Sequence, residues 1–215
     1  KNNFCNLIVF DKKDLDLTNQ NQVANFYENY RPEITILAAA KVGGIAANSS
    51  DQLGFLYQNL MIQNNVMLSA AKNKCKKIVF LGSSCIYPRE CKQPIKEEYL
   101  LSGPLEKTNE GYALAKISGL KLAKYISNKY NISCICPMPC NLYGTNDNFD
   151  LETSHVLPAL IRKIHDAKQL KKNNVEIWGT GSPRREFLHV DDLADAAVFC
   201  LENWHPFTEN APKDF

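Results

Sequence analysis

The most informative absences in this 215-residue sequence are long apolar runs and dense charge of one sign. No apolar stretch approaches the roughly 20 residues that cross a bilayer, and no signal peptide opens the chain, so we expect neither a membrane anchor nor secretion. The net charge is only +2, and no basic patch is interleaved with aromatic residues, which argues against nucleic-acid binding. We expect a cytoplasmic protein whose 45% hydrophobic residues form one substantial core, or one domain plus the start of another.

Cysteine occurs eight times but never as a C-x-x-C pair, so a metal site has no support. Cys134 and Cys136 alternate within an apolar run, and we interpret them as small core residues in a reducing compartment. The ten glycines never form a G-x-G-x-x-G turn, which usually carries the pyrophosphate of a dinucleotide.

What the sequence does contain is a regular alternation of apolar runs and amphipathic stretches. It predicts strands at 7–10, 34–40, 77–81, 132–138 and 175–178, and helices at 19–30, 52–73, 109–130, 154–168 and 190–202. Repeated βα units of this kind predict an α/β fold, a doubly wound parallel sheet of the Rossmann-like, NAD(P)-binding type. We expect this domain to span residues 1–150 without its first strand and glycine loop. Residues 151–215 are expected to form a partial substrate-binding region with one segment returning to the sheet.

A Ser-rich strand end and a Tyr-x-x-x-Lys pair give the strongest chemical signal. Ser83 follows the apolar run 77–81, and Tyr112 and Lys116 lie one helical turn apart on one face of a predicted helix. A nearby ammonium favours a phenolate, so we expect Lys116 to lower the pKa of Tyr112 from about 10. Ser83 can then hold a carbonyl oxygen while Tyr112 transfers its proton. Tyr125 begins a second Tyr-x-x-x-Lys pair without such a strand end and is expected on the surface.

Five stretches of the sequence resemble the GDP-L-fucose synthases, a family of extended short-chain dehydrogenases/reductases. They are residues 37–45 (LAAAKVGGI), 80–88 (FLGSSCIYP), 141–149 (NLYGTNDNF), 154–158 (SHVLP) and 178–192 (WGTGSPRREFLHVDD). The Ser-Tyr-Lys pattern is common to the whole superfamily, whereas the second, third and fourth stretches are narrower. By this resemblance we expect a piece of a longer enzyme, without the N-terminal glycine-rich turn and much of the C-terminal domain.

The resemblance implies a bifunctional reaction, in which GDP-4-keto-6-deoxy-D-mannose is epimerised at C3 and C5 and then reduced at C4 with NADPH. Cys85 and His155 match the family's epimerisation pair, and groups with pKa values near neutrality suit such proton transfers. In the reduction, Tyr112 is expected to protonate the C4 oxygen, Ser83 to orient it, and Lys116 to hold the nicotinamide ribose.

By the same resemblance, further residues bind the two ligands. The NADP(H) site is expected to contain Lys12, Asp16, Leu17, Leu81, Gly82, Ser83, Ser84, Lys116, Pro139, Cys140, Asn141, Leu142 and His155. The GDP-sugar site is expected to contain Lys163, Trp178 and Arg185, because Trp can stack on a base and Arg can grip a diphosphate.

The choice between NADP and NAD stays open at the residue level, although NADP is favoured. Lys12 and Lys13 suit a 2′-phosphate, whereas Asp11 beside them suits the 2′-hydroxyl of NAD. His165 and His189 are expected to be structural.

Two other functions remain compatible with the residues. Another nucleotide-sugar epimerase, dehydratase or reductase would share the Ser-Tyr-Lys core but would not need Cys85 together with His155. The third possibility is a truncated, catalytically silent paralogue that acts as a binding or dimerisation partner. By resemblance, the family pairs as homodimers through two long helices, which here are 52–73 and 109–130.

Overall fold

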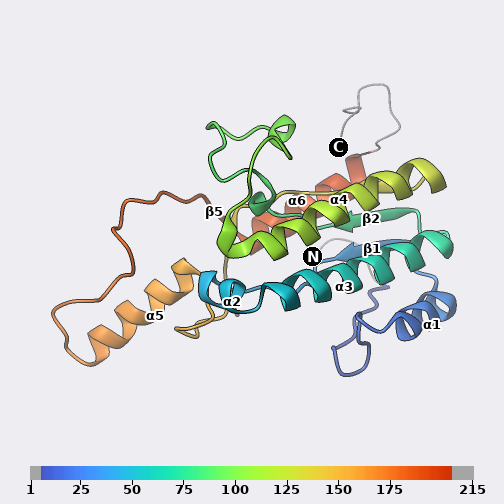
Figure 1. Cartoon of the computed structure of the whole chain (residues 1–215). Coiled ribbons are helices and arrows are strands. Elements are labelled where there is room, and N and C mark those ends of the chain that lie inside the picture. The colour runs from blue at the N-terminus through green and yellow to red at the C-terminus, as the bar shows by residue number, and fades with distance from the viewer. Residues whose placement is uncertain (1–5, 205–215) are drawn as a thin grey trace.

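The computed structural model describes residues 6–204 and is built on a parallel sheet with helices on both faces (Figure 1). The sheet has the order β1-β2-β3, formed by β1 (Ile34–Leu37), β2 (Lys77–Phe80) and β3 (Ser133–Ile135). A second parallel pair joins β4 (Asn141–Tyr143) to β5 (Phe187–His189). The α-helices are α1 (Gln20–Tyr30), α2 (Ile45–Ser50), α3 (Gln52–Lys72), α4 (Glu110–Tyr130), α5 (Val156–Gln169) and α6 (Val190–Asn203).

The side chains of β2 alternate between two cores, which shows why the helices form two layers. Ile78 and Phe80 are buried with residues of α1, α3 and α4, among them Met67 and Ile126. Val79 points the other way, into a cluster with Ile135 of β3 and Leu201 of α6. Because successive strand residues face opposite sides of a sheet, β2 is covered on both faces. The predicted α/β fold with a doubly wound sheet is confirmed.

The long helices α3 and α4 lie side by side across one face of the sheet (Figure 1). The fully buried Gln63 amide of α3 donates to the backbone oxygen of Ala115 in α4 at 2.8 Å. Gly119 permits close packing, since a Cβ there would lie 2.4 Å from the Phe80 ring. These contacts fix the position of α4, which carries Tyr112 and Lys116.

Two predicted strands are wrong. Residues 7–10 are irregular and 175–178 form no strand, because in the part of the chain that the structure describes neither run has a neighbouring strand to pair with. Leu7 and Val9 are 76% and 84% exposed, and Phe10 packs its ring on Phe26 at a centroid distance of 5.6 Å. The helix α2 and the strands β4 and β5 were not predicted from the sequence.

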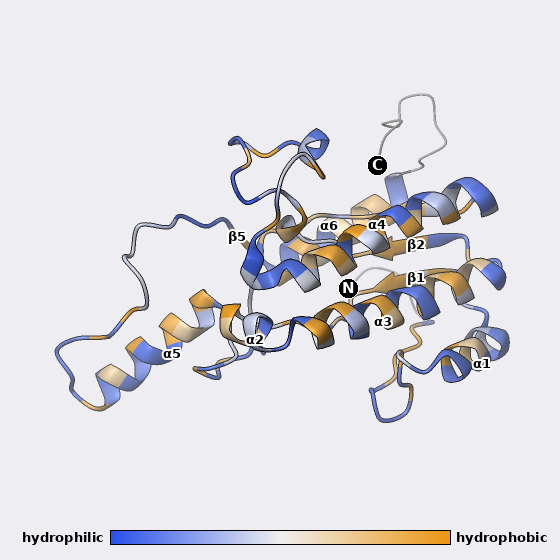
Figure 2. Ribbon diagram, in the orientation of Figure 1, coloured by the Kyte–Doolittle hydropathy of each residue, from blue (hydrophilic) through white to orange (hydrophobic). Residues whose placement is uncertain are grey.

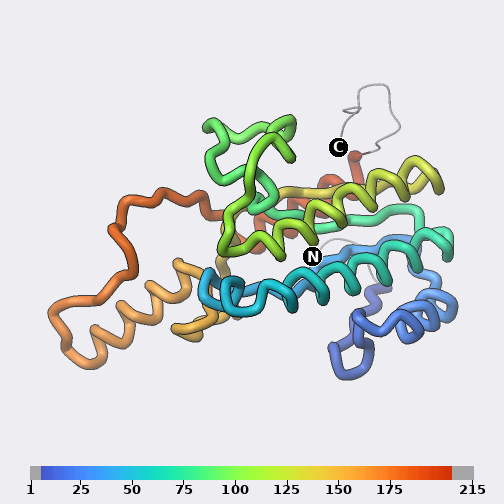
Figure 3. Tube along the Cα trace, in the orientation of Figure 1, coloured from blue at the N-terminus to red at the C-terminus, as the bar shows by residue number. Residues whose placement is uncertain are grey.

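The segment between α5 and β5 differs from the rest of the molecule. It runs as an extended connection away from the sheet (Figure 3), and its residues are mostly hydrophilic, whereas hydrophobic colour gathers on β1, α3 and α4 (Figure 2). The helix α6 then returns to the sheet, and the ammonium of Lys77 donates to the Leu201 carbonyl. Residues 1–5 and 205–215 of the two predicted units lie outside the described residues.

Candidate active site

The loop after β2 places Ser83 at the carboxyl edge of the sheet. Its backbone is extended, and its hydroxyl accepts a hydrogen bond from the Cys85 N–H at 3.2 Å. The N–H of Gly82 donates to the Pro137 carbonyl at 2.9 Å, and the N–H of Ser84 donates to the Pro139 carbonyl at 3.2 Å. These two bonds bring together the predicted cofactor segments 81–84 and 139–142, which follow neighbouring strands.

Gly82 lies at this close approach of two loops. A Cβ at this position would lie 2.3 Å from the Met138 sulfur, a separation that real contacts do not reach. The glycine therefore serves the packing of the strand-end loops.

Tyr112 lies in the first turn of α4 and is held by three neighbours. Its hydroxyl lies close to the Ser83 side chain, which acts to lower the pKa of Tyr112. Its ring meets the Phe55 ring edge-on at a centroid distance of 6.5 Å. Burial, together with the nearby Cys85, raises the pKa of Tyr112 to about 12, and the nearby Ser83 side chain only partly opposes this. The phenol therefore carries its proton at neutral pH.

Lys116 is almost fully buried, with 5% of its surface exposed. Its ammonium donates to the Leu81 carbonyl at 2.7 Å and lies 4.8 Å from the centre of the Phe80 ring. Burial lowers the pKa of Lys116 to about 8. The ammonium is 5.7 Å from the centre of the Tyr112 ring. The expectation that Lys116 lowers the pKa of Tyr112 is wrong for this geometry, because desolvation dominates at both groups.

The two predicted epimerisation residues lie on different parts of the chain. Cys85 is partly buried in the short turn Ser84–Ile86, next to Ser83 and Tyr112. His155 is exposed at the N-cap of α5, where its side chain makes no capping bond. Among residues 6–204, no hydrogen bond or ion pair joins His155 to Cys85 or Tyr112.

Three residues of the predicted NADP(H) site, Lys12, Asp16 and Leu17, come from the segment before α1 and not from the strand-end loops. Lys12 is exposed in a turn, and Leu17 packs against the main hydrophobic core. The Asp16 carboxylate accepts the Thr18 hydroxyl at 2.8 Å and the Thr18 N–H at 2.9 Å, which lowers the pKa of Asp16. After β3, Pro139 and Cys140 lead into β4, which contains Asn141 and Leu142.

Two of the three predicted sugar-nucleotide residues meet in the structure. The Lys163 ammonium lies 4.9 Å from the centre of the Trp178 ring and donates to the Glu176 carbonyl at 3.2 Å. Trp178 is 72% exposed. Arg185 is also exposed, and its guanidinium donates to the Arg184 carbonyl rather than to either of them.

A cavity of about 320 Å³ opens between α5 and the β4–β5 pair. Its wall includes Tyr143, Asp147, Phe149, Ile161 and His189. His189 caps α6 by accepting the Asp191 N–H at 3.3 Å, which agrees with a structural role. No sequence pattern pointed to this cavity, although the resembling stretch 141–149 forms part of its wall.

Sequence reasoning also missed the polar residues that support the site. Asn59 and Gln63 are buried and lie one turn apart on α3, and each side chain bonds backbone groups outside its own helix. The sequence did contain a signal for them, because two polar residues one turn apart on a largely apolar helix face need hydrogen-bond partners when they are buried.

Two further observations on the described residues concern a metal site and helices that could span a membrane. Within residues 6–204, no cluster of three or more His, Cys, Asp or Glu side chains could hold a metal ion. None of the described helices is both long enough and apolar enough to cross a membrane.

The parallel sheet with helices on both faces and the Ser-Tyr-Lys group at its carboxyl edge define a dinucleotide-dependent class of enzyme folds. In agreement, residues 3–210 match the NAD dependent epimerase/dehydratase family, and the chain belongs to that family.

Particular relatives sharpen this assignment and confirm the resemblance noted in the sequence. The chain is 52% identical over 204 residues to putative GDP-L-fucose synthase 2 of Arabidopsis thaliana, covering 95% of this chain and 62% of that protein. The solved GDP-L-fucose synthetase of Naegleria fowleri bound to NADP has 32% identity and a TM-score of 0.80, covering 90% of this chain and 63% of that one.

A third relative is named for a different substrate. The structure of a GDP-6-OMe-4-keto-L-xylo-heptose reductase from C. jejuni has 38% identity and a TM-score of 0.88, covering 98% of this chain and 69% of that one. The chain spans about 62% of the length of the curated GDP-L-fucose synthases that it matches.

Proposed function

We propose that the protein containing this chain is a GDP-L-fucose synthase, which epimerises GDP-4-keto-6-deoxy-D-mannose at C3 and C5 and reduces C4 with NADPH. The observation that carries the proposal is the placement of Ser83 beside a protonated Tyr112, with Lys116 one turn away. The similarity to GDP-L-fucose synthases of about 50% identity supports the choice of substrate.

The geometry of Ser83 and Tyr112 suits the reductive direction of the reaction. A group that donates a proton to the C4 oxygen must hold that proton beforehand. Burial raises the pKa of Tyr112 to about 12, so its phenol meets this requirement. The Ser83 hydroxyl lies beside the same phenol, and it can orient the carbonyl oxygen that receives the proton.

NADP(H) supplies the hydride when bound, and the residues at the sheet edge fit such a ligand. An ammonium has three donors, and Lys116 directs one of them to the Leu81 carbonyl, which leaves two for ribose hydroxyls. The strand-end segments 81–84 and 139–142 lie beside it. Lys12 offers a cation for the 2′-phosphate, and the Naegleria relative, solved with NADP bound, supports NADP over NAD.

For the epimerisation, Cys85 and His155 are proposed as the two proton-transfer groups. One group removes the acidic C–H proton beside the ketone, which leaves an enolate, and the other returns a proton to the opposite face. Cys85 lies next to Ser83 and Tyr112, so its thiol is close to the site of reduction. The His155 imidazole is exposed at the start of α5 and is not used as a cap of that helix.

The sugar nucleotide is proposed to bind against Lys163, Trp178 and Arg185. Lys163 already lies over one face of the Trp178 indole, which leaves the other face of this exposed ring for a guanine base. Arg185 offers a planar fork that suits a diphosphate.

A second candidate is a 4-keto reductase of another GDP-linked sugar that does not epimerise its substrate. The similarity to the heptose reductase from C. jejuni favours it. The two candidates differ in one measurable step, the exchange of the C3 and C5 protons with solvent.

We also propose the domain division, the oligomer and the compartment. Residues 1–150 form the NAD(P)-binding domain, and residues 151–215 form part of the substrate-binding region. Two copies pair through α3 and α4, and the outer face of α3 exposes Leu53 and Tyr57 by 77% and 59%. The compartment that we propose is the cytoplasm. Light scattering of wild type and of Tyr57→Glu tests the pairing, since a buried charge at the interface should give a monomer.

The test of the function uses the gene product that contains this chain at its full encoded length. We expect it to oxidise NADPH with GDP-4-keto-6-deoxymannose, followed by the loss of absorbance at 340 nm. Tyr112→Phe should slow this about 10²- to 10⁴-fold, the usual contribution of a general acid. Tyr125→Phe, on the same helix but 64% exposed, is the matched control and should keep full activity. A folded protein that binds NADPH but shows no turnover would instead favour the silent paralogue.

Epimerisation is tested separately in deuterium oxide. The wild type should incorporate deuterium at C3 and C5 of the keto sugar, and Cys85→Ser should lose this exchange while keeping hydride transfer. Cys91→Ser, in the neighbouring loop, is the matched cysteine control. Reduction without any exchange in the wild type would establish the second candidate.

A further inference from the structure

The segment from Lys41 to Ile45 lies inside the resembling stretch 37–45, and the proposed mechanism leaves it without a role. We propose that Gly44, held by Asn48, positions His155, so that this glycine segment is a positioning element for the epimerisation step. The inference rests on the proposed function, in which His155 transfers a proton.

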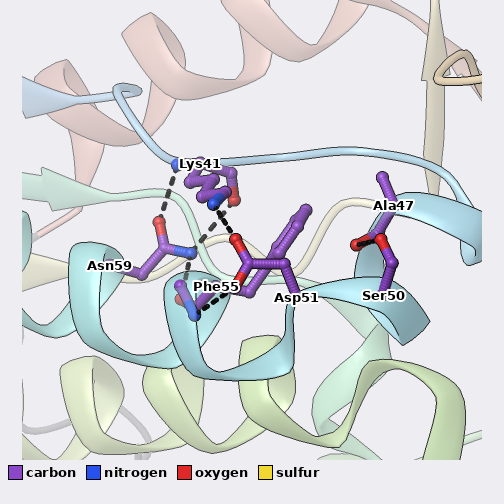
Figure 4. Close-up of polar contacts among 7 residues, drawn as sticks. Lys41, Ala47, Ser50, Asp51, Phe55 and Asn59 are labelled. Atoms are coloured by element: carbon purple, nitrogen blue, oxygen red, sulfur yellow. Dashed lines mark hydrogen bonds and ion pairs between the residues drawn. The ribbon is translucent and has the colours of Figure 1, made fainter.

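The first end of the segment is anchored to the start of α3, as Figure 4 shows. The Lys41 ammonium bonds the Asp51 carboxylate at 2.5 Å, and Asp51 also caps α3 by accepting the Gly54 N–H at 2.9 Å. Asn59 bonds both backbone groups of Lys41, accepting its N–H at 2.8 Å and donating to its carbonyl at 3.0 Å. Lys41 is therefore fixed at both its backbone and its side chain.

This anchor also reaches the reductive half of the site. The Lys41 ammonium lies 5.0 Å from the centre of the Phe55 ring. Phe55 is 2% exposed, and its ring meets the edge of the Tyr112 ring. The segment therefore begins beside Phe55, whose ring packs against Tyr112.

The glycine end of the segment is held by a buried asparagine. Asn48 of α2 is 6% exposed, and its side-chain nitrogen donates to the Gly43 carbonyl at 2.7 Å and to the Gly44 carbonyl at 3.1 Å. The two bonds satisfy the buried amide nitrogen of Asn48 and fix the conformation of the glycine pair, whereas its Oδ1 has no hydrogen-bond partner among the described residues.

From Gly44 the contact passes directly to the residues before His155. The Gly44 N–H donates to the Thr153 carbonyl at 3.1 Å. A Cβ at Gly44 would lie 2.7 Å from the Ser154 carbonyl oxygen, which is backbone and cannot rotate away. His155 follows as the N-cap of α5. The lack of a side chain at Gly44 therefore sets how closely the start of α5 approaches the sheet domain.

The loop that receives Gly44 is itself rigidly built. The Asp150 carboxylate accepts the Thr153 hydroxyl at 2.8 Å, the Thr153 N–H at 2.9 Å and the Glu152 N–H at 3.1 Å. The Ser154 N–H donates to the Asp150 carbonyl at 3.0 Å. A shift at Thr153 or Ser154 is therefore transmitted to His155 instead of being absorbed by the loop.

The consequence is specific to one step. His155 must reach the carbon atoms beside the ketone for epimerisation, whereas hydride transfer and protonation at C4 use Tyr112, Ser83 and Lys116. A displacement of α5 by about an ångström can slow a reaction about 10²-fold when it moves a reacting group. It should act on proton exchange at C3 and C5 far more than on hydride transfer.

The experiment compares these two rates in Gly44→Ala and in wild type, using the full-length gene product. Exchange is measured as deuterium incorporation into the keto sugar without NADPH. Hydride transfer is measured in reverse with GDP-L-fucose and NADP⁺. In that direction C4–H gives its hydride to the cofactor, and the C4 hydroxyl gives its proton to the deprotonated form of Tyr112. No epimerisation is needed for this step. We expect the ratio of exchange to hydride transfer to fall at least about tenfold in Gly44→Ala.

Asn48→Ala is the second variant and removes the bonds to the glycine pair without adding bulk. If Gly44→Ala does not fold, the ratio of exchange to hydride transfer in Asn48→Ala tests the positioning role of the glycine pair. Asn73→Ala is the matched control, because the Asn73 side chain also donates to a backbone carbonyl, that of Ser69 at 2.9 Å, but at the far end of α3. This control should leave the ratio at the wild-type value.

The outcomes separate this inference from the proposed function. If the wild type shows both rates and the two variants lose them equally or not at all, the positioning role of Gly44 is refuted while the function stands. If the wild type shows hydride transfer but no exchange, the epimerase half of the function fails, and this inference fails with it.

Discussion

The sheet with α3 and α4 and the segment from α5 to β5 each carry part of the proposed site, but they hold their residues by different means. Around Ser83, Tyr112 and Lys116, nearly every supporting side chain is buried, and Phe80 and Ile78 are at most 1% exposed. In the second region Ile164 and Trp178 are 58% and 72% exposed. The group of Ser83, Tyr112 and Lys116, proposed to act in the reduction, is thus positioned by close packing, whereas the proposed sugar-nucleotide residues depend on a few surface contacts.

The largest expected difference between the two regions is in the free energy of unfolding after one apolar side chain is removed from each. Phe80→Ala should lower the free energy of unfolding by about 3–5 kcal/mol, because it empties a filled core position. Ile164→Ala should change it by no more than about 0.5 kcal/mol, as is usual for exposed sites. Both are measured by urea unfolding of the full-length protein. Equal losses would mean that α5 is as well buried in the whole protein as the sheet is here.

A smaller effect concerns the buried charge in the first region. Burial lowers the pKa of Lys116 from 10.5 to about 8, so between these pH values the unfolded state binds more protons than the folded state. Stability contributed by this group therefore rises with pH from about 8 to 10.5, since the cost of burying the ammonium disappears as it deprotonates. The free energy of unfolding of wild type should rise over this range relative to Lys116→Met.

Urea unfolding at several pH values measures this difference. Lys72→Met, at an exposed lysine of α3, is the matched control. A difference between wild type and Lys116→Met that does not change with pH would show that the ammonium is well solvated and that the packing around it is loose.

The smallest effect belongs to the second region. The contact between Lys163 and Trp178 is exposed, so a double-mutant cycle with Lys163→Met and Trp178→Ala should give a coupling of about 0.5–1 kcal/mol in stability. Trp178→Ala should raise the KM for the sugar nucleotide and leave kcat almost unchanged, as expected for uniform binding. A large fall in kcat would place Trp178 among the residues that act in the transition state.

Sequence reasoning succeeded where the signal is local. The predicted helices 52–73 and 109–130 differ from α3 and α4 by one residue at one end, because long amphipathic runs and a capping residue such as Asp51 define a helix by themselves. The grouping of Ser83, Tyr112 and Lys116 was also foreseen, since a strand end and one helix face are local features. Short apolar runs predicted strands less well, and residues 7–10 show that such a run forms a strand only beside a partner strand.

Residue spacing alone was enough to specify the fold class, the long helices and the grouping of Ser83, Tyr112 and Lys116, because it places those side chains on one face or at one strand end. The protonation of that group came from packing, since burial raises the pKa of Tyr112 and lowers that of Lys116. Packing also supplied the support of the group by Gln63 and Asn59, and the contact of Gly44 with the residues before His155. Desolvation and contacts between distant segments depend on the folded chain, and no pattern of neighbouring residues contains them.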